Sequence, residues 1–168
     1  MLLRKIETNL DNLLTLAKEK ESDNNRFIDF LKLRNSKQLD AEVLILNNNI
    51  TAKIDCTICG NCCKSLMINV SDDEADAIAN HLNLSRTDFD EQNLEKGGTM
   101  MVMNAIPCTF LDNNICTVYE HRFAGCKEFP AMHLPDFNKR LFTTFMHYSR
   151  CPIIYNVVEG LKVVTAFK

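Results

Sequence analysis

The cysteines are the residues whose type and spacing indicate chemistry. Four of them stand within eight residues, in the segment Cys56-Thr-Ile-Cys59-Gly-Asn-Cys62-Cys63. A two-residue gap between cysteines lets a tight loop turn both sulfurs towards one ion, and thiolates are soft ligands that suit zinc and iron–sulfur centres. Gly60 favours such a turn because glycine relieves backbone crowding. The segment therefore predicts a metal site.

The neighbouring residues Cys62 and Cys63 bear on how many metal positions there are. In an extended chain, the side chains of adjacent residues point to opposite sides. We therefore expect this pair to serve two metal positions, or two corners of a cluster, rather than one tetrahedral zinc ion.

Four further cysteines are widely spaced, so the fold must bring them to a shared site. They are Cys108, Cys116, Cys126 and Cys151. Eight thiolates suffice for two four-cysteine sites, or for one cluster with spare thiols. Structural disulfides, isolated buried thiols and a thioredoxin-like redox pair are the competing interpretations. A reducing compartment disfavours structural disulfides, and eight thiols are too many to be isolated buried ones. The chain lacks the strand and helix pattern that surrounds a thioredoxin-like redox pair.

The cysteine segments resemble those of the CxxCxxCC family, also called YkgJ-type cysteine cluster proteins. The similar segments are C-T-I-C-G-N-C-C (56–63), P-C-T-F-L-D-N-N-I-C-T-V-Y-E-H-R (107–122), G-C-K-E-F-P (125–130) and C-P (151–152). The resemblance covers about residues 54–153. It implies a zinc- or iron-chelating domain, related to a cysteine-rich region of flagellin lysine methylases. Two departures, Phe123 where the family commonly has Pro and Lys127 where it often has Arg, involve no thiol.

The resemblance places all eight cysteines on family cysteine positions. The predicted metal ligands are Cys56, Cys59, Cys62, Cys63, Cys108, Cys116, Cys126 and Cys151. The predicted cofactor is zinc or iron, the iron including an iron–sulfur cluster, since both kinds of centre accept four thiolates. With so many thiols, no histidine is needed as a ligand. Tyr119, Glu120 and Arg122 stand between two predicted ligands. Amide, hydroxyl and guanidinium donors of this segment either donate hydrogen bonds to thiolate sulfur, or the segment is a helical turn with a Glu–Arg surface pair.

Composition and net charge limit the classes of partner that we expect. The chain has 168 residues, 46% of them hydrophobic and 24% charged, which is typical of a globular protein. Its formal net charge of -3 provides no basic field, so we expect no nucleic-acid partner. The N-terminus lacks the apolar core of a secretory signal and the chain has no eighteen-residue apolar run, so we expect no membrane and a cytoplasmic location. In that compartment thiols stay reduced.

The apolar pattern predicts an α+β fold that is mainly helical. Residues 1–50 lack Cys, Gly and Pro and have helical spacing, interrupted by the polar segment 21–25, which indicates two antiparallel helices. This helical hairpin extension either packs on the rest of the chain or docks a protein partner. Residues 51–168 form the predicted cysteine-cluster metal-binding domain, with a short hairpin.

Local signals predict the elements that position the cysteines. Ser71 and Glu74 form a capping box. The predicted elements are a helix over 72–82 behind that box, a short helix capped by Ser85 or Thr87, a strand over 100–106, a hairpin over 110–115 with Cys108 and Cys116 on its arms, a strand over 140–148, and a helix over 153–159 begun by Pro152.

Three functions remain open at this stage. The first is a metal-binding protein whose site is structural, stores or delivers zinc or iron, or supports a docking surface. The second is an iron–sulfur enzyme for electron or methyl transfer, as the methylase relationship suggests. The third is an interaction module in which residues 1–50 dock a larger complex. Ligand type alone does not choose the metal.

Overall fold

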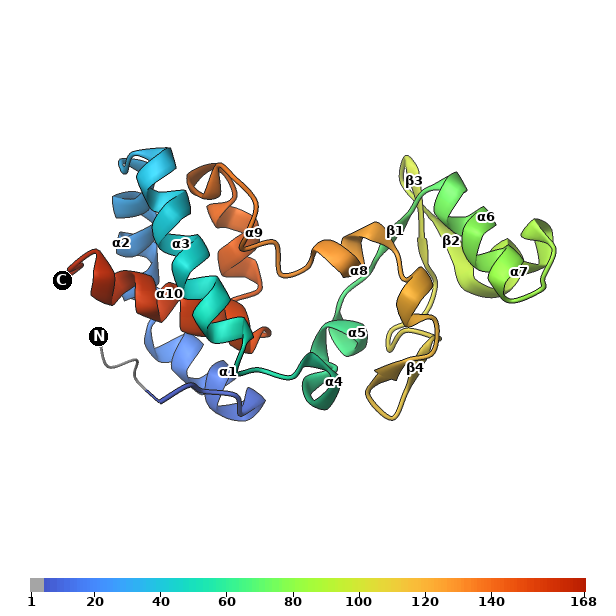
Figure 1. Cartoon of the computed structure of the whole chain (residues 1–168), viewed down its shortest axis with the longest axis horizontal. Coiled ribbons are helices and arrows are strands. Elements are labelled where there is room, and N and C mark those ends of the chain that lie inside the picture. The colour runs from blue at the N-terminus through green and yellow to red at the C-terminus, as the bar shows by residue number, and fades with distance from the viewer. Residues whose placement is uncertain (1–4) are drawn as a thin grey trace. The chain divides into compact units, whose positions relative to one another are not determined.

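The computed structural model describes residues 5–168, and the chain forms two compact units (Figure 1). The helical unit joins the described residues up to Asp55 with Pro130–Lys168, and the cysteine unit is Cys56–Phe129. The fold is α+β and mainly helical, as predicted. The units differ from the predicted domains, because residues 130–168 group with the N-terminal helices rather than with the cysteine cluster.

The helical unit contains the longest helices of the described chain. Its elements are α1 (Leu10–Glu19), α2 (Glu21–Lys32), α3 (Ser36–Thr51), the 3-10 helix η2 (Phe137–Lys139), α9 (Leu141–Met146) and α10 (Pro152–Val164).

Residues 10–51 form three helices rather than the predicted two. The polar segment 21–25 lies within α2, and the chain turns one residue earlier, at Lys20. A second break follows α2, where the side chain of Asn35 accepts a hydrogen bond from the backbone N–H of Gln38 and so begins α3. An Asn at this position satisfies a backbone donor that the helix cannot, which favours a helix start there.

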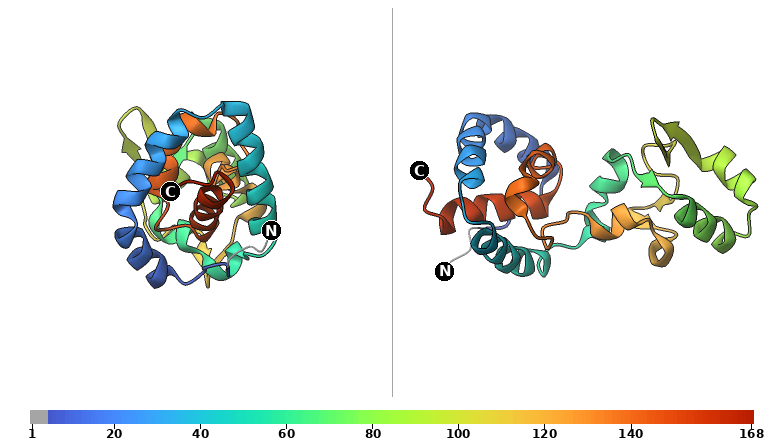
Figure 2. Two further views of the ribbon diagram at one scale, coloured as in Figure 1. Left: turned by 90° about the vertical axis from the view of Figure 1, so that its left-hand side faces the viewer. Right: turned by 90° about the horizontal axis from the view of Figure 1, so that it is seen from above.

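Helix α10 forms the centre of the helical unit, packing against α3 and α1 (Figure 2, left). Pro152 at its first turn confirms the predicted helix start, since proline lacks only an N–H that would have no helical partner there. The α3–α10 contact is close: a Cβ on Gly160 would lie 3.0 Å from Leu46 Cδ2. The buried side chains of α10 are Pro152, Ile153, Ile154, Tyr155, Val157, Val158 and Leu161.

The predicted strand over 140–148 is wrong. Residues Leu141–Met146 form helix α9, which buries Leu141 and Thr144 on one side. Strand propensity depends on packing partners, and the partners here are helices and η2 rather than another strand.

A partly buried charged cluster joins α1, α2 and α10. Glu159 accepts hydrogen bonds from the ammonium groups of Lys20 and Lys162 and from the hydroxyl of Tyr148, the last at 2.8 Å. Lys162 also donates to Asp23 at 2.8 Å. Burial alone would raise the pKa of Glu159, but these hydrogen bonds outweigh burial and lower the pKa. The carboxylate therefore stays ionised inside the helical unit.

The cysteine unit is built from short elements. They are α4 (Cys56–Cys59), α5 (Asn61–Ser65), β1 (Asn69–Val70), α6 (Asp72–His81), α7 (Arg86–Asn93), β2 (Leu94–Gly97), β3 (Met100–Met103), β4 (Leu111–Asp112), β5 (Ile115–Cys116), the 3-10 helix η1 (Tyr119–His121) and α8 (Ala124–Glu128).

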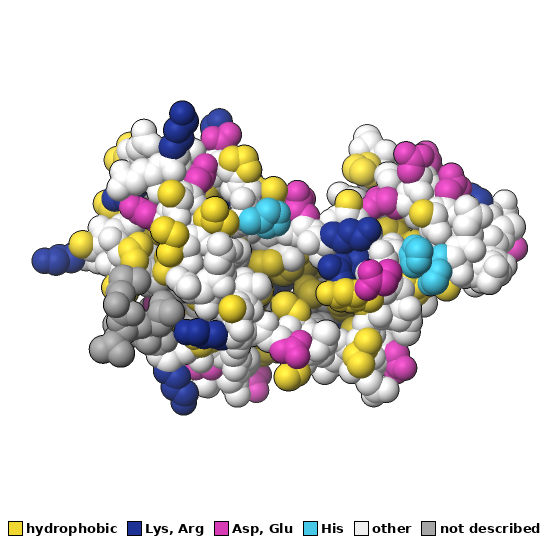
Figure 3. Space-filling model, in the orientation of Figure 1, with side chains coloured by type: hydrophobic (Ala, Val, Ile, Leu, Met, Phe, Trp, Pro, Cys, Tyr) yellow, Lys and Arg dark blue, Asp and Glu magenta, His cyan; other side chains and the backbone are white. Residues whose placement is uncertain are grey.

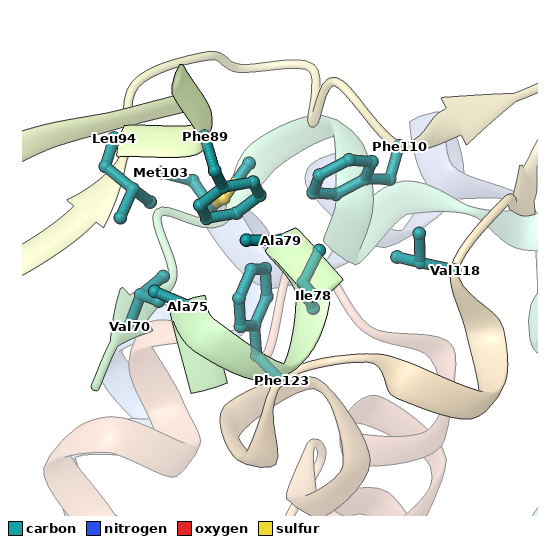
Figure 4. Packing of buried hydrophobic residues seen from close by; sticks show 10 residues of the cluster. All are labelled: Val70, Ala75, Ile78, Ala79, Phe89, Leu94, Met103, Phe110, Val118 and Phe123. Atoms are coloured by element: carbon teal, nitrogen blue, oxygen red, sulfur yellow. The ribbon is translucent and has the colours of Figure 1, made fainter. Parts of the chain in front are cut away.

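One hydrophobic core holds the cysteine unit together. Strands β1, β3 and β2 form an antiparallel sheet in that order, and β4 pairs with β5. Side chains from the sheet, from α6 and α7, and from residues 110–123 point towards one another (Figure 4). The core residues are Val70, Ala75, Ile78, Ala79, Phe89, Leu94, Met103, Phe110, Val118 and Phe123.

Most local predictions for the cysteine unit are confirmed. The capping box of Ser71 and Glu74 is present at the start of α6, and Ser85 caps α7. The short helix capped by Ser85 ends at Asn93, the next residue Leu94 begins β2, and the strand predicted over 100–106 ends at Met103. The hairpin forms from β4 and β5.

The surface carries both signs of charge. Acidic and basic side chains are interspersed over the face drawn in Figure 3. Within residues 5–168, no helix combines the length and apolar character that crossing a membrane requires.

Replacing Glu159 with Gln should lower the free energy of unfolding of the full chain by about 2 kcal/mol near neutral pH, because it removes the acceptor of charged hydrogen bonds. A lowered folded-state pKa stabilises the fold above the ordinary glutamate pKa of about 4.3, and this contribution is lost as pH falls through the folded value. The difference between the native chain and the variant should therefore shrink below about pH 4. Urea unfolding at several pH values, monitored by circular dichroism, measures this difference in free energy of unfolding.

Glu19→Gln is the matched control, since Glu19 is an exposed glutamate of the same unit. The control should unfold like the native chain at each pH. Equal stabilities of native chain and Glu159→Gln near neutral pH would contradict a stabilising role for the charged cluster.

Candidate metal centre

A tight turn joins the first four cysteines. The backbone N–H of Gly60 donates to the carbonyl of Cys56 at 2.8 Å, and Gly60 adopts a left-handed conformation with φ +58. A Cβ at this position would also lie 3.0 Å from Asn114 Oδ1. Both the conformation and the close approach favour glycine. The turn thus separates α4, with Cys56 and Cys59, from α5, with the next two cysteines.

The thiols of Cys62 and Cys63 lie on the same side of the chain, with 3.9 Å between their Sγ atoms. The expectation that they point to opposite sides is wrong, because both residues belong to helix α5 rather than to an extended segment. Neighbouring residues in a helix are separated by about 100° of rotation, so their sulfurs can approach. Their adjacency therefore gives no evidence of two metal positions.

Backbone hydrogen bonds connect Cys63 with the segment of Cys108 and Cys116. The N–H of Cys108 donates to the carbonyl of Cys63 at 2.8 Å, and Cys116 on β5 pairs with Leu111 on β4. Cys108 precedes β4 and does not lie on a hairpin arm as predicted, whereas Cys116 does.

The hairpin turn also holds the first cysteine loop. The side-chain amide of Asn114 donates to the carbonyl of Ile58 at 3.2 Å, and this carbonyl belongs to α4. Segments distant in the sequence are therefore fixed to each other without any contribution from sulfur.

Cys126 is placed by α8, which is tied to the start of α6. The N–H of Ala124 donates to Glu74 Oε1 at 2.5 Å, while the other carboxylate oxygen of Glu74 accepts from Ser71. Burial acts to raise the pKa of Glu74, but these hydrogen bonds prevail and the pKa is lowered. The ionised Glu74 thus serves both as part of the capping box and as the acceptor that fixes α8.

Three thiols, those of Cys108, Cys116 and Cys126, are partly buried against the core of the cysteine unit. Figure 4 shows Phe110, Val118 and Phe123, the core side chains nearest to these cysteines in sequence, facing the same cluster. Packing on one core brings thiols from three separate segments to one region.

The thiols influence one another electrostatically. The hydrogen bond with Cys62 lowers the pKa of Cys63 to about 6. Burial, and then the negative charges of Cys63, Cys108 and Cys116, raise the pKa of Cys126 to about 12. Burial also raises the pKa of Cys108 and of Cys116, and the charge of Cys63 adds to both effects. Such mutual effects require that these four thiols lie near one another.

A partly buried arginine accompanies these thiols. The positive charge of Arg122 acts to lower the pKa of Cys63, Cys116 and Cys126. Its guanidinium carbon lies 3.7 Å from the centre of the Tyr119 ring. Its Nε and Nη1 are buried and have no hydrogen-bond partner among the described residues.

The structure brings some predicted ligands together and leaves others apart. The thiols of Cys62, Cys63, Cys108, Cys116 and Cys126 lie in one region of the cysteine unit, and Cys56 and Cys59 lie on α4 beside it in sequence. Cys151 belongs to the helical unit, where it is buried and precedes α10. None of the eight cysteines, all within the described residues, forms a disulfide.

The donor set fits a soft cation. In the described part of the chain, no group of three or more His, Cys, Asp or Glu side chains has the spacing of a metal site. Thiolates repel one another, and a cation is the group that offsets this repulsion and allows them to meet. Zinc and iron–sulfur centres both bind thiolates, and the two unpartnered donors of Arg122 suit a centre of net negative charge.

Three positioning residues were not predicted in these roles. The capping-box signal identified Glu74, but its second hydrogen bond joins residues far apart in the sequence. Asn114 falls within the predicted hairpin over 110–115, with no predicted contact to the first cysteine loop. For Arg122, the sequence left open a hydrogen bond to sulfur and a surface ion pair.

On the surface of the cysteine unit, the rings of His81 and His121 stack with 3.9 Å between their centres.

Comparisons with known proteins agree with the predicted resemblance. A family model, CxxCxxCC, described as "Putative zinc- or iron-chelating domain", matches residues 55–151. No curated protein and no solved structure matches the chain in these comparisons. The family match covers more than half of the chain, including all eight cysteines. The chain belongs to the CxxCxxCC family.

Proposed function

We propose that the cysteine unit binds zinc or iron through thiolates, and that Cys63, Cys108, Cys116 and Cys126 are the ligands of its principal centre. The observation that carries this proposal is the placement of four separate segments: Cys108, Cys116 and Cys126 pack against one core, and the backbone N–H of Cys108 donates to the carbonyl of Cys63 at 2.8 Å. Their number and chemistry equal the ligand set of a four-cysteine zinc site or of an iron–sulfur cluster. Family membership supports metal binding independently.

The backbone supports this assignment because hydrogen bonds place the ligand segments beside one another. The Cys108–Cys63 backbone hydrogen bond joins two segments, and the contact between Ala124 and Glu74 joins α8 to α6. A bound metal would add further links between the same segments.

The remaining cysteines extend the proposal to all eight. Cys62 lies beside Cys63, and Cys56 and Cys59 stand on α4. Cys151 is included among the proposed ligands only because it falls within the family match. These four thiols either hold a second centre or are spare thiols around one cluster.

The proposed role is that of a metal-binding protein in a reducing cytoplasm. The centre either stabilises the cysteine unit or stores and delivers zinc or iron.

The full chain, purified anaerobically, should contain zinc or iron by elemental analysis. Cys108→Ser and Cys126→Ser should each lose the metal of the principal centre, since a serine hydroxyl does not replace a thiolate. The metal-to-protein ratio of the native chain gives the number of centres. Brown protein that contains iron and labile sulfide identifies a cluster, and colourless protein that contains zinc identifies a zinc site.

Cys56→Ser is the matched comparison, because Cys56 is exposed and lies outside the proposed principal set. This variant should keep the metal of the principal centre, and it should lose metal only where a second centre exists. Full metal content in both Cys108→Ser and Cys126→Ser would contradict the proposed ligand set.

A chelator should loosen the cysteine unit and leave the helical unit intact. Thiolate metal sites contribute as much as about 10 kcal/mol to the folding of small domains. Amide hydrogen exchange of the full chain should therefore accelerate in α4, α5, β4–β5 and α8 after metal removal. The amides of α3 and α10 serve as the internal control and should stay protected.

Adding back the metal that elemental analysis identified should restore the slow exchange. Identical exchange in the cysteine unit before and after complete metal removal would contradict a stabilising role of the metal.

A further inference from the structure

Arg122 presents a hydrogen-bonding imbalance within the described residues. Its Nε and Nη1 are buried, and neither finds an acceptor. Buried polar groups are nearly always hydrogen-bonded, and leaving a donor of a charged group without a partner costs more than leaving a neutral one. Two buried nitrogens of one guanidinium without a partner therefore point to an acceptor that belongs beside them.

The surroundings of Arg122 identify the chemistry of that acceptor. Among the described residues, no carboxylate forms an ion pair with Arg122, whereas its charge acts on Cys63, Cys116 and Cys126. The thiols are thus the acidic groups on which the charge of Arg122 acts. Because Nε and Nη1 are inaccessible to solvent, an acceptor from solution does not reach them.

The backbone and Tyr119 hold the guanidinium in this place. The N–H of Arg122 closes the 3-10 helix η1 on the carbonyl of Tyr119, and the next residue, Phe123, is buried in the core. The ring of Tyr119 covers one face of the guanidinium at 3.7 Å. Stacking on an aromatic face leaves the N–H groups in the guanidinium plane available to acceptors.

We propose that Arg122 is a positioning residue of the metal centre, whose Nε and Nη1 donate hydrogen bonds to the sulfur atoms of the bound thiolates. This inference rests on the proposed function. The hydrogen bonds spread the negative charge of the sulfurs, reduce their mutual repulsion and orient them towards the metal. Residues that orient metal ligands in this way contribute about 10- to 100-fold to metal affinity.

The test compares Arg122→Gln and Arg122→Lys with Lys127→Gln in the metal-free full chain. Zn²⁺ affinity is measured by competition with a chromophoric chelator, and Co²⁺ reports the electron density on sulfur through its sulfur-to-metal charge-transfer band. Lys127→Gln is the matched control, because it removes one positive charge at an exposed residue directly after a cysteine.

Arg122→Gln should weaken Zn²⁺ binding by about tenfold or more and shift the Co²⁺ charge-transfer band to lower energy, since sulfur that accepts fewer hydrogen bonds gives up electrons more easily. Arg122→Lys keeps the charge with fewer directed donors, so it should recover part of the affinity. Lys127→Gln should match the native chain in both measurements. A purely structural role would alter the stability of the metal-free chain and leave the band of the bound Co²⁺ in place.

Native Zn²⁺ affinity and an unshifted Co²⁺ band in Arg122→Gln would overturn the inference while leaving the proposed metal function standing. A native chain that binds neither Zn²⁺ nor Co²⁺ nor iron would instead overturn the proposed function itself, and the inference with it. If Arg122→Gln does not fold, Tyr119→Leu decides, because it keeps the guanidinium but removes the ring that covers it. That variant should weaken Zn²⁺ binding, and native affinity in it would count against the inference.

Discussion

Repulsion between thiolates is the constraint on which the cysteine unit depends. Thiols from separate segments pack on one core, where burial first, and then the charge of neighbouring sulfurs, raise the pKa of Cys108, Cys116 and Cys126. Bringing them together therefore requires compensation, which the unit provides with the partly buried charge of Arg122 and, in the proposed function, with a bound metal. The backbone bonds of Cys108 and Ala124 hold the segments in place independently.

The two units treat buried charge differently. In the helical unit, Glu159 meets two lysines and a tyrosine hydroxyl, and Lys162 also meets Asp23, so the charges are paired within the protein. In the cysteine unit, Arg122 has two buried nitrogens without an acceptor. The helical unit also has a buried donor without an acceptor among the described residues, Arg34 Nε, but the same guanidinium pairs with Glu42 through Nη2. Two such donors on one guanidinium are uncommon, because buried polar groups are nearly always hydrogen-bonded.

Cys151 lies within the family match but outside the compact cysteine unit. The family match runs from residue 55 to 151, so it ends in the helical unit, beyond the compact cysteine unit. The chain leaves the helical unit after α3 and returns to it at residue 130. Within that returning segment, α10 packs against α3. A domain that is continuous in a family description is thus divided between two compact bodies in the fold.

The sequence by itself determined the chemistry and the local elements. Cysteine spacing predicted a metal-binding family, and the capping box of Ser71 and Glu74 and the proline at 152 predicted helix starts, because these signals act within a few residues. Tertiary structure alone decided the rest. Residues 141–146 became helical through their packing partners, Cys62 and Cys63 came to lie side by side through helix α5, and Arg122 became partly buried beside thiols from distant segments. Such contacts depend on long-range packing, which residue spacing does not encode.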